Sequence, residues 1–156
     1  MYNSVQSPNV DVSGNMQKVE LFLTGRNLLD MDFFSKSDPY VKVFFKPSPN
    51  ARMMQIGRTE TVMDNLNPNF RASFGLDFVF ETTQEIKFEV FDEDDEKDQR
   101  NDDYIGETST TLGALTGAKN QTSILELKNP KNPKLKCGKL IVRIEPASDS
   151  NGTNSE

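Results

Sequence analysis

The sequence predicts an all-β fold, an eight-stranded antiparallel β-sandwich. Apolar and polar residues alternate as in strands that bury one face, in the segments 19–23, 41–45, 74–80, 86–90 and 140–144. No window of about 11 residues or more shows the period of a helix. Residues that form turns (Asn, Asp, Gly and Pro) separate the segments, which favours a sandwich over alternating strands and helices.

Weaker elements complete the sandwich. Three further strands are expected at 53–61, 104–110 and 123–127, and one helical turn at most is expected within 111–118. Phe45 is predicted to lie in the core and its neighbour Phe44 on the outer face. Gly57 interrupts a strand pattern, which favours a β-bulge there. Asp38 and Asn67 each precede a proline, which restricts them to extended geometry.

Residues 18–146 are predicted to form one domain, since 156 residues suit one compact unit. The segments 1–17 and 147–156 are rich in Ser, Asn and Gly, so we expect both to be disordered tails. The segment 147–156 is alternatively the place where a fragment was cut from a longer protein. No apolar run is long enough to span a membrane, and no secretory signal is recognisable. The one cysteine, Cys137, cannot form an internal disulfide, which favours the cytoplasm.

Composition argues against two classes of function. The chain has no histidine, which removes the most common general base and every Ser-His or Cys-His arrangement. The protein is therefore not expected to be an enzyme. With 18 basic and 24 acidic residues the formal net charge is −6, and an acidic chain is a poor partner for the phosphates of nucleic acids.

The negative charge is concentrated in one segment. Residues 92–103 hold eight acidic and two basic side chains, a net charge of −6, so the other residues are collectively neutral. Even-numbered residues of the strand at 86–90 are expected to face inward, and Asp92 and Asp94 continue that parity just past the apolar run. Their carboxylates are therefore expected to converge toward the axis of the sandwich.

A second acidic group, Asp30, Asp32 and Asp38, precedes the strand at 41–45. If both connections lie at one end of the sandwich, the carboxylates face one another and suit a hard ion such as calcium, which takes about 6–8 oxygen ligands. A charged loop is more often a solvated surface, so that interpretation stays open. An EF-hand does not fit, because Lys97 stands where its turn glycine belongs.

Four motifs resemble C2 domains. Residues 28–32 with 35–43 resemble the first calcium loop and following strand of that family, 65–70 its Leu-Asn-Pro turn, and 88–94 with 103–106 its third loop. The resemblance covers about 18–146, and residues 77–90 are most similar to the N-terminal C2 domain of copines. It implies the C2 fold in its type II topology and a longer parent chain with other domains.

The resemblance also implies a set of calcium ligands. These are the carboxylates of Asp32, Asp38, Asp92, Asp94 and Asp103, with the backbone carbonyls of Met31 and Glu93. The spacing between the last two carboxylates is longer than in many C2 domains, so Asp102 and Asp98 remain alternatives to Asp103. Asp30, Asp95 and Glu96 are expected at the surface or around the ligands.

The function that the resemblance implies is calcium-dependent binding to anionic phospholipid membranes, by a protein that moves from the cytoplasm to the inner face of membranes when calcium rises. Phosphatidylserine oxygens would complete the coordination of the ion. Phe33 and Phe34, at the tip of the first loop, are candidates for insertion into the bilayer, with packing of Phe34 under the loop as the alternative. Lys42 and Arg58 are a weaker candidate site for phosphoinositides.

Two other functions remain as alternatives. A calcium-independent protein–protein interaction module would keep the fold and leave the acidic residues solvated. A carboxylate-based hydrolase is poorly supported, because the acidic residues form one highly charged rim without a candidate nucleophile. The complete set of five aspartates favours the calcium-binding interpretation.

Overall fold

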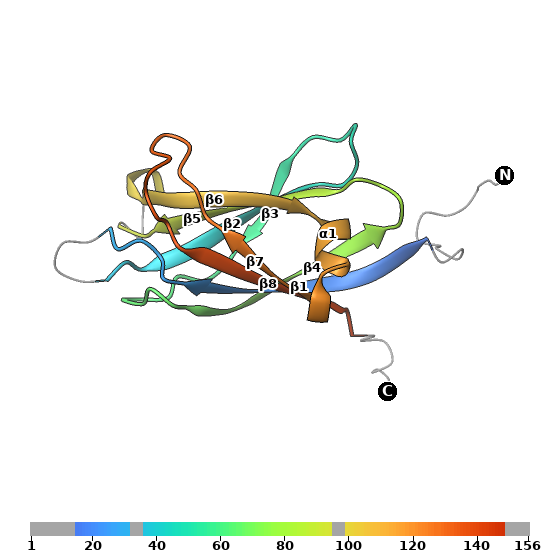
Figure 1. The fold of residues 1–156 in the computed structure, drawn as a ribbon, viewed down its shortest axis with the longest axis horizontal. Coiled ribbons are helices and arrows are strands. Elements are labelled where there is room, and N and C mark those ends of the chain that lie inside the picture. Colours follow the sequence, from blue (N-terminus) through green and yellow to red (C-terminus); the bar gives the residue numbers. More distant parts are fainter. Residues whose placement is uncertain (1–14, 32–35, 95–98, 149–156) are drawn as a thin grey trace.

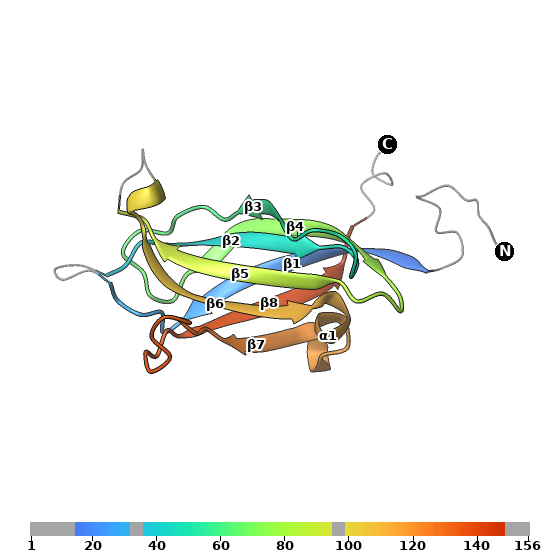
Figure 2. The same cartoon turned by 90° about the horizontal axis from the view of Figure 1, so that it is seen from above.

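The computed structural model describes residues 15–31, 36–94 and 99–148. Eight strands form two antiparallel four-stranded sheets, in the orders β4-β1-β8-β7 and β3-β2-β5-β6. Figures 1 and 2 show the two layers of the sandwich. The strands are β1 (Met16–Arg26), β2 (Pro39–Lys46), β3 (Met54–Arg58), β4 (Asn69–Val79), β5 (Glu85–Asp92), β6 (Asp103–Thr111), β7 (Thr122–Glu126) and β8 (Lys139–Pro146).

The predicted fold class is therefore confirmed, and each of the eight predicted segments overlaps a strand. The C-terminal strand β8 pairs with both β1 and β7, the neighbour relation that a type II order requires. Helical structure in the described part of the chain is limited to α1 (Leu112–Thr116) and the short 3-10 turns η2 (Gln99–Asn101) and η3 (Lys119–Gln121). No helix in this part is long and apolar enough to cross a membrane.

Period-two burial builds the core between the sheets. In β5, every second residue from Ile86 to Asp92 is buried, and β1 and β8 alternate in the same way. Phe45 is buried and Phe44 is only partly so, as predicted. The expectation that Phe80 continues the buried row of 74–80 is wrong: β4 ends at Val79, and Phe80 is 43% exposed. The chain turns there, with Glu81 at a positive φ.

Two register shifts modify the sheet β3-β2-β5-β6. One lies in the β2–β3 pair beside Gly57, where the sequence predicts a bulge. The other lies in the β5–β6 pair: Val90 is opposite Gly106, but Phe91 is opposite Tyr104, so Ile105 is an extra residue in β6. Such an insertion reverses the facing of every residue beyond it. This second bulge decides which acidic residues meet.

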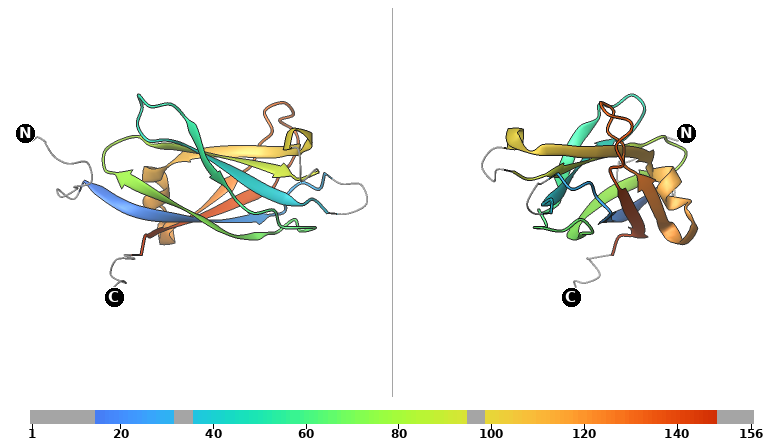
Figure 3. Two further views of the ribbon diagram at one scale, coloured as in Figure 1. Left: turned by 180° about the vertical axis from the view of Figure 1, so that it is seen from behind. Right: turned by 60° about the vertical axis from the view of Figure 1, so that its left-hand side comes forward.

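One end of the sandwich, here named the loop end, carries the described parts of the connections 27–38, 59–68 and 93–102. Figures 1 and 3 show these segments together, opposite the end where β1 begins and β8 ends. The two acidic connections, 27–38 and 93–102, therefore lie at the same end of the sandwich, which is the condition for one joint acidic site. Of the predicted tails, 1–14 and 149–156 lie outside the described residues, and β1 already begins at Met16.

Candidate metal centre

Three carboxylates gather at the loop end. Asp92, Asp94 and Asp103 each offer a carboxylate oxygen, and these oxygens all lie within 4.8 Å of one another. Asp92 is 0% exposed, Asp103 is partly buried, and Asp94 is exposed. Clustered carboxylates repel one another and present only hard oxygen donors, so the group is chemically suited to a cation such as calcium.

Strand geometry explains why these residues meet. Asp92 continues the inward row of Phe88 and Val90, as the sequence predicts. On β6, Gly106 lies opposite Val90, so an unbroken ladder would turn Tyr104 and Asp102 inward. The bulge at Ile105 shifts the pairing by one residue and places Asp103 opposite Asp92. The structure thus groups Asp103, and not Asp102, with Asp92.

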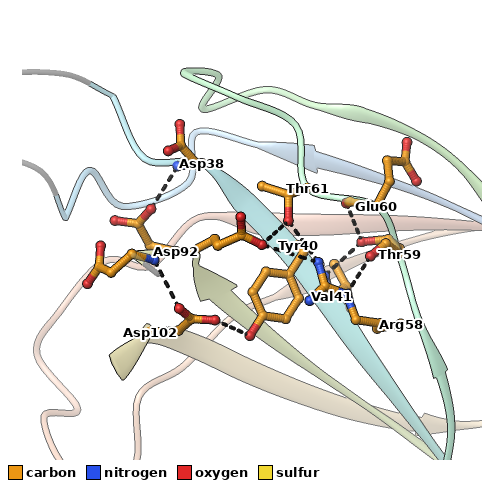
Figure 4. Close-up of polar contacts among 11 residues, drawn as sticks. Asp38, Tyr40, Val41, Arg58, Thr59, Glu60, Thr61, Asp92 and Asp102 are labelled. Atoms are coloured by element: carbon orange, nitrogen blue, oxygen red, sulfur yellow. Dashed lines mark hydrogen bonds and ion pairs between the residues drawn. The ribbon is translucent and has the colours of Figure 1, made fainter. Parts of the chain in front are cut away.

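Asp38 joins the start of β2 to the end of β5. Its backbone N–H donates to Asp92 Oδ1 at 2.8 Å, and its carbonyl accepts from the N–H of Glu93 at 2.9 Å. Figure 4 shows Asp38 beside Asp92. The Asp38 carboxylate accepts from the N–H of Asp64 at 2.6 Å, and among the described residues it is not part of the three-carboxylate group. The contacts of Asp38 with Asp92 and Glu93 are thus made by its backbone, and its carboxylate lies outside the three-carboxylate group.

The first loop is anchored on both sides. The buried Ser37 hydroxyl accepts from the N–H of Met31 at 2.8 Å and donates to the carbonyl of Leu29 at 3.1 Å. Asp64 Oδ1 accepts from the N–H of Lys36 at 2.8 Å. The predicted residues Asp32, Phe33 and Phe34, and the alternative ligand Asp98, lie outside the described residues, and Asp30 is exposed.

The Glu93 side chain contacts a different set of residues from its neighbours Asp92 and Asp94. It accepts from the Thr61 hydroxyl at 2.8 Å and lies 3.8 Å from the Arg58 guanidinium. The Glu93 carboxylate is thus held by Thr61 and Arg58. The resemblance predicts a metal-binding role for the Glu93 backbone carbonyl and not for this carboxylate. The contact with Arg58 also ties the third loop to β3.

The candidate phosphoinositide residues Lys42 and Arg58 are neighbours across the β2–β3 ladder. Both cations lie over aromatic rings: Lys42 Nζ is 4.8 Å from the centre of Phe91, and the Arg58 guanidinium is 3.6 Å from that of Tyr40. Arg58 also donates to the Thr59 carbonyl and the Thr61 hydroxyl. A phosphate at this place would compete with these contacts.

Two tyrosines on the outer face of the β3-β2-β5-β6 sheet, Tyr40 and Tyr104, have hydroxyl groups with raised pKa values. Burial raises the pKa of Tyr40 far above its ordinary value, and hydrogen bonding to Asp102 raises it further. The pKa of Tyr104 is raised by burial and by its hydrogen bond to Glu107. Both hydroxyls therefore remain protonated donors at neutral pH.

Sequence reasoning missed three residues that support the site: Ser37, Asp64 and, as a hydrogen-bond acceptor, Asp102. Ser37 had a local signal, because a serine directly before Asp38 in a loop commonly bonds nearby backbone. Asp64 had none, since its partners Lys36 and Asp38 lie 28 and 26 positions away. Only the folded arrangement brings those groups together.

Comparison with known proteins agrees with this architecture. Residues 20–127 match the family model of the C2 domain. Copine-B of Dictyostelium discoideum is 36% identical over 122 residues, which are 76% of this chain and 23% of that protein. This chain thus spans less than a quarter of the length of that relative.

Two solved structures show the same fold. A C2 domain of plant Extended Synaptotagmin 1 superposes with a TM-score of 0.63 at 20% identity, covering 85% of this chain and 97% of that one. A pair of C2 domains from Extended-Synaptotagmin 2, solved with calcium bound, gives 0.60 at 21% identity and covers 83% and 45%. Since the family model matches more than half of the residues, this chain belongs to the C2 domain family.

Proposed function

We propose that this domain, residues 18–146, binds calcium at the loop end and uses the ion to dock on anionic phospholipid membranes. The observation that carries the proposal is the group Asp92, Asp94 and Asp103, with one carboxylate fully buried and their oxygens within 4.8 Å. The first loop would add Asp32, Asp38 and the carbonyl of Met31, and the third loop the carbonyl of Glu93.

Calcium suits this site for electrostatic reasons. Bringing carboxylates together disfavours their charged forms unless a cation offsets the repulsion. Calcium accepts about 6–8 oxygens in flexible geometry, which matches ligands contributed by two loops rather than by one continuous segment. The backbone contacts of Asp38 with Asp92 and Glu93 hold these two loops together.

The membrane step follows from the charge. Residues 92–103 carry −6 and are repelled by the anionic cytoplasmic leaflet. Even two calcium ions, about +4 in all, would not make that segment positive. Attraction would therefore come from coordination positions of the ion that are filled by phosphatidylserine carboxylate or phosphate oxygens.

Apolar insertion would add to this attraction. Phe33 and Phe34 belong to the first loop, and full transfer of one phenyl ring from water contributes roughly 1.5–3 kcal/mol. Lys42 and Arg58 would be secondary contacts to phosphoinositides. In the cell, the domain would move from the cytoplasm to the inner face of membranes as calcium rises, as the targeting part of a longer copine-like protein with no catalytic role of its own.

Calcium titration and vesicle sedimentation test the proposal. Calcium is expected to raise the melting temperature, because a ligand of the folded state stabilises by RT ln(1 + [L]/Kd). The protein should then sediment with phosphatidylserine-containing vesicles, and not with pure phosphatidylcholine vesicles. Asp92→Asn and Asp103→Asn should each weaken calcium binding by about tenfold or more, since each removes a charged ligand.

The matched control is Asp77→Asn, which removes an exposed aspartate outside the loop end that pairs with Lys18 at 3.2 Å. This variant should bind calcium as the wild type does. A melting temperature that stays constant up to millimolar calcium would contradict the proposal and favour a calcium-independent protein–protein interaction module.

A further inference from the structure

Asp102 connects the third loop to the outer face of the β3-β2-β5-β6 sheet. Its Oδ1 accepts from the N–H of Asp94 at 2.9 Å, and its Oδ2 accepts from the Tyr40 hydroxyl at 2.6 Å. Figure 4 shows the Tyr40 hydroxyl directed at Asp102. Both carboxylate oxygens are therefore committed to contacts within the protein, one of them to the backbone of a candidate ligand residue.

Tyr40 is a rigid anchor for this contact. Its side chain is 0% exposed. The ring stacks on Phe91 at a centroid distance of 5.5 Å, and the Arg58 guanidinium lies 3.6 Å from its centre. A hydroxyl held in this way has little freedom to move, so the acceptor bonded to it is also restrained. The restraint passes through Asp102 to the Asp94 backbone.

The β-bulge in β6 separates the roles of two adjacent aspartates. It pairs Asp103 with Asp92, and Asp103 belongs to the three-carboxylate group. Asp102, one residue earlier, instead contacts Tyr40 on the outer face. One strand irregularity thus gives Asp103 the position of a ligand and Asp102 that of a support.

We propose that Asp102 is a positioning residue, held by Tyr40, which orients the Asp94 segment for calcium before the ion arrives. This inference rests on the proposed function, since it concerns the same site. A preformed loop loses less conformational freedom on binding, which strengthens binding without any new contact to the ion. Asp102 itself does not coordinate calcium.

Substitutions at 102 distinguish support from coordination. Asp102→Asn removes the charge but keeps an acceptor for the Asp94 N–H, and its amide nitrogen can donate to the Tyr40 oxygen, which reverses the direction of the second contact without removing it. Calorimetry should give a calcium Kd within about threefold of the wild type for this variant. Asp102→Ala, which removes both contacts, should weaken binding by about five- to tenfold without changing the number of ions bound.

Tyrosine variants test the anchor. Tyr40→Phe keeps the ring but loses the hydroxyl, and it should weaken calcium binding about as much as Asp102→Ala. Combining Tyr40→Phe with Asp102→Ala should give little additional loss of affinity, because both substitutions interrupt the same path from Tyr40 through Asp102 to the Asp94 backbone. The matched control is Tyr104→Phe, which removes a hydroxyl on the same face that donates to Glu107 and not to the third loop. It should leave the calcium Kd unchanged.

Three outcomes would overturn the inference. If Asp102→Asn loses as much affinity as Asp103→Asn, Asp102 is a ligand. If Tyr104→Phe weakens calcium binding as much as Tyr40→Phe, the effect is general destabilisation of the sheet. If the wild type binds no calcium, the proposed function fails and this inference with it, a result that the wild-type titration separates from the other two.

Discussion

Individual polar side chains hold the loops of this domain in place. Ser37 is completely buried and joins the two sides of the first loop, and Asp64 bonds the backbone of Lys36 while its own N–H bonds Asp38. Buried polar groups of this kind are expected to be fully bonded, because an unsatisfied one is expensive. At this scale, the geometry of the acidic site depends on residues outside the three-carboxylate group.

Ser37→Ala tests this dependence. The substitution leaves the Met31 N–H and the Leu29 carbonyl without the hydroxyl between them, so we expect a loss of about 1–3 kcal/mol in the free energy of unfolding. Urea denaturation of the calcium-free protein measures the change. Ser109→Ala, at an exposed position of β6, should change the stability by less than about 0.5 kcal/mol. Equal effects of the two substitutions would contradict the assigned role of Ser37.

At the scale of the elements, one side chain covers part of an exposed sheet edge. The strand β4 is an edge of its sheet, and Glu60, just beyond β3, covers part of that edge. The Glu60 carboxylate accepts from the N–H groups of Arg71 at 2.6 Å and Ala72 at 3.1 Å. One side chain thus links the margins of the two sheets, and it blocks donors that an edge strand otherwise offers to other chains.

The pH dependence of stability should reveal this contact. Burial acts to raise the pKa of Glu60, but the backbone hydrogen bonds from Arg71 and Ala72 outweigh it, and the pKa lies below its ordinary value. A carboxyl group with a lowered pKa in the folded state stabilises the protein above its unfolded pKa, and this contribution is lost as pH falls through the folded value.

Glu60→Gln should therefore lower the free energy of unfolding at pH 7 by about 1–2 kcal/mol and reduce the loss of stability between about pH 5 and pH 3. Denaturant titrations at several pH values measure both effects. Glu81→Gln is the control, since Glu81 lies in an exposed turn. A variant at position 60 with an unchanged acid profile would refute the assignment of this carboxylate.

Charge distribution governs the molecule as a whole. The net charge of −6 equals that of residues 92–103 alone, and the charges of all other residues of the chain sum to zero. The net negative charge of the chain is thus that of one segment at the loop end. Repulsion within that end opposes folding in the absence of a cation, and dissolved salt screens it over a Debye length of roughly 10 Å at 0.1 M. The domain is therefore expected to be least stable when both salt and calcium are low.

The melting temperature of the calcium-free protein should accordingly rise by a few degrees when NaCl is increased from about 0.02 M to 0.3 M. Saturating calcium should reduce this salt dependence, because the ions neutralise the same charges. Thermal scans at matched pH, in a chelator and then in calcium, provide the comparison. A melting temperature that falls with salt in the chelator would show that repulsion at the loop end is not the dominant charge effect.

Much of this arrangement could be predicted because strands have a simple period. The alternation of apolar residues located five of the eight strands, and weaker signals indicated the other three. The even parity of 86–90 correctly predicted that Asp92 turns inward. Phe80 was misassigned because the same alternation continues past the point where β4 ends, and a turn at Glu81 leaves no sign in the apolar pattern.

The sequence by itself determined the sandwich, its buried rows and the concentration of acidic residues near two strand ends, since these depend on local pattern. Only the tertiary structure shows that Asp103, and not Asp102, lies opposite Asp92 and in the three-carboxylate group. The bulge at Ile105 reverses the facing of β6, and the contact between Tyr40 and Asp102 spans 62 positions. The period-two pattern of β6 is compatible with both registers, so the sequence of β6 does not reveal the one-residue shift. The register is selected by the pairing of β6 with β5.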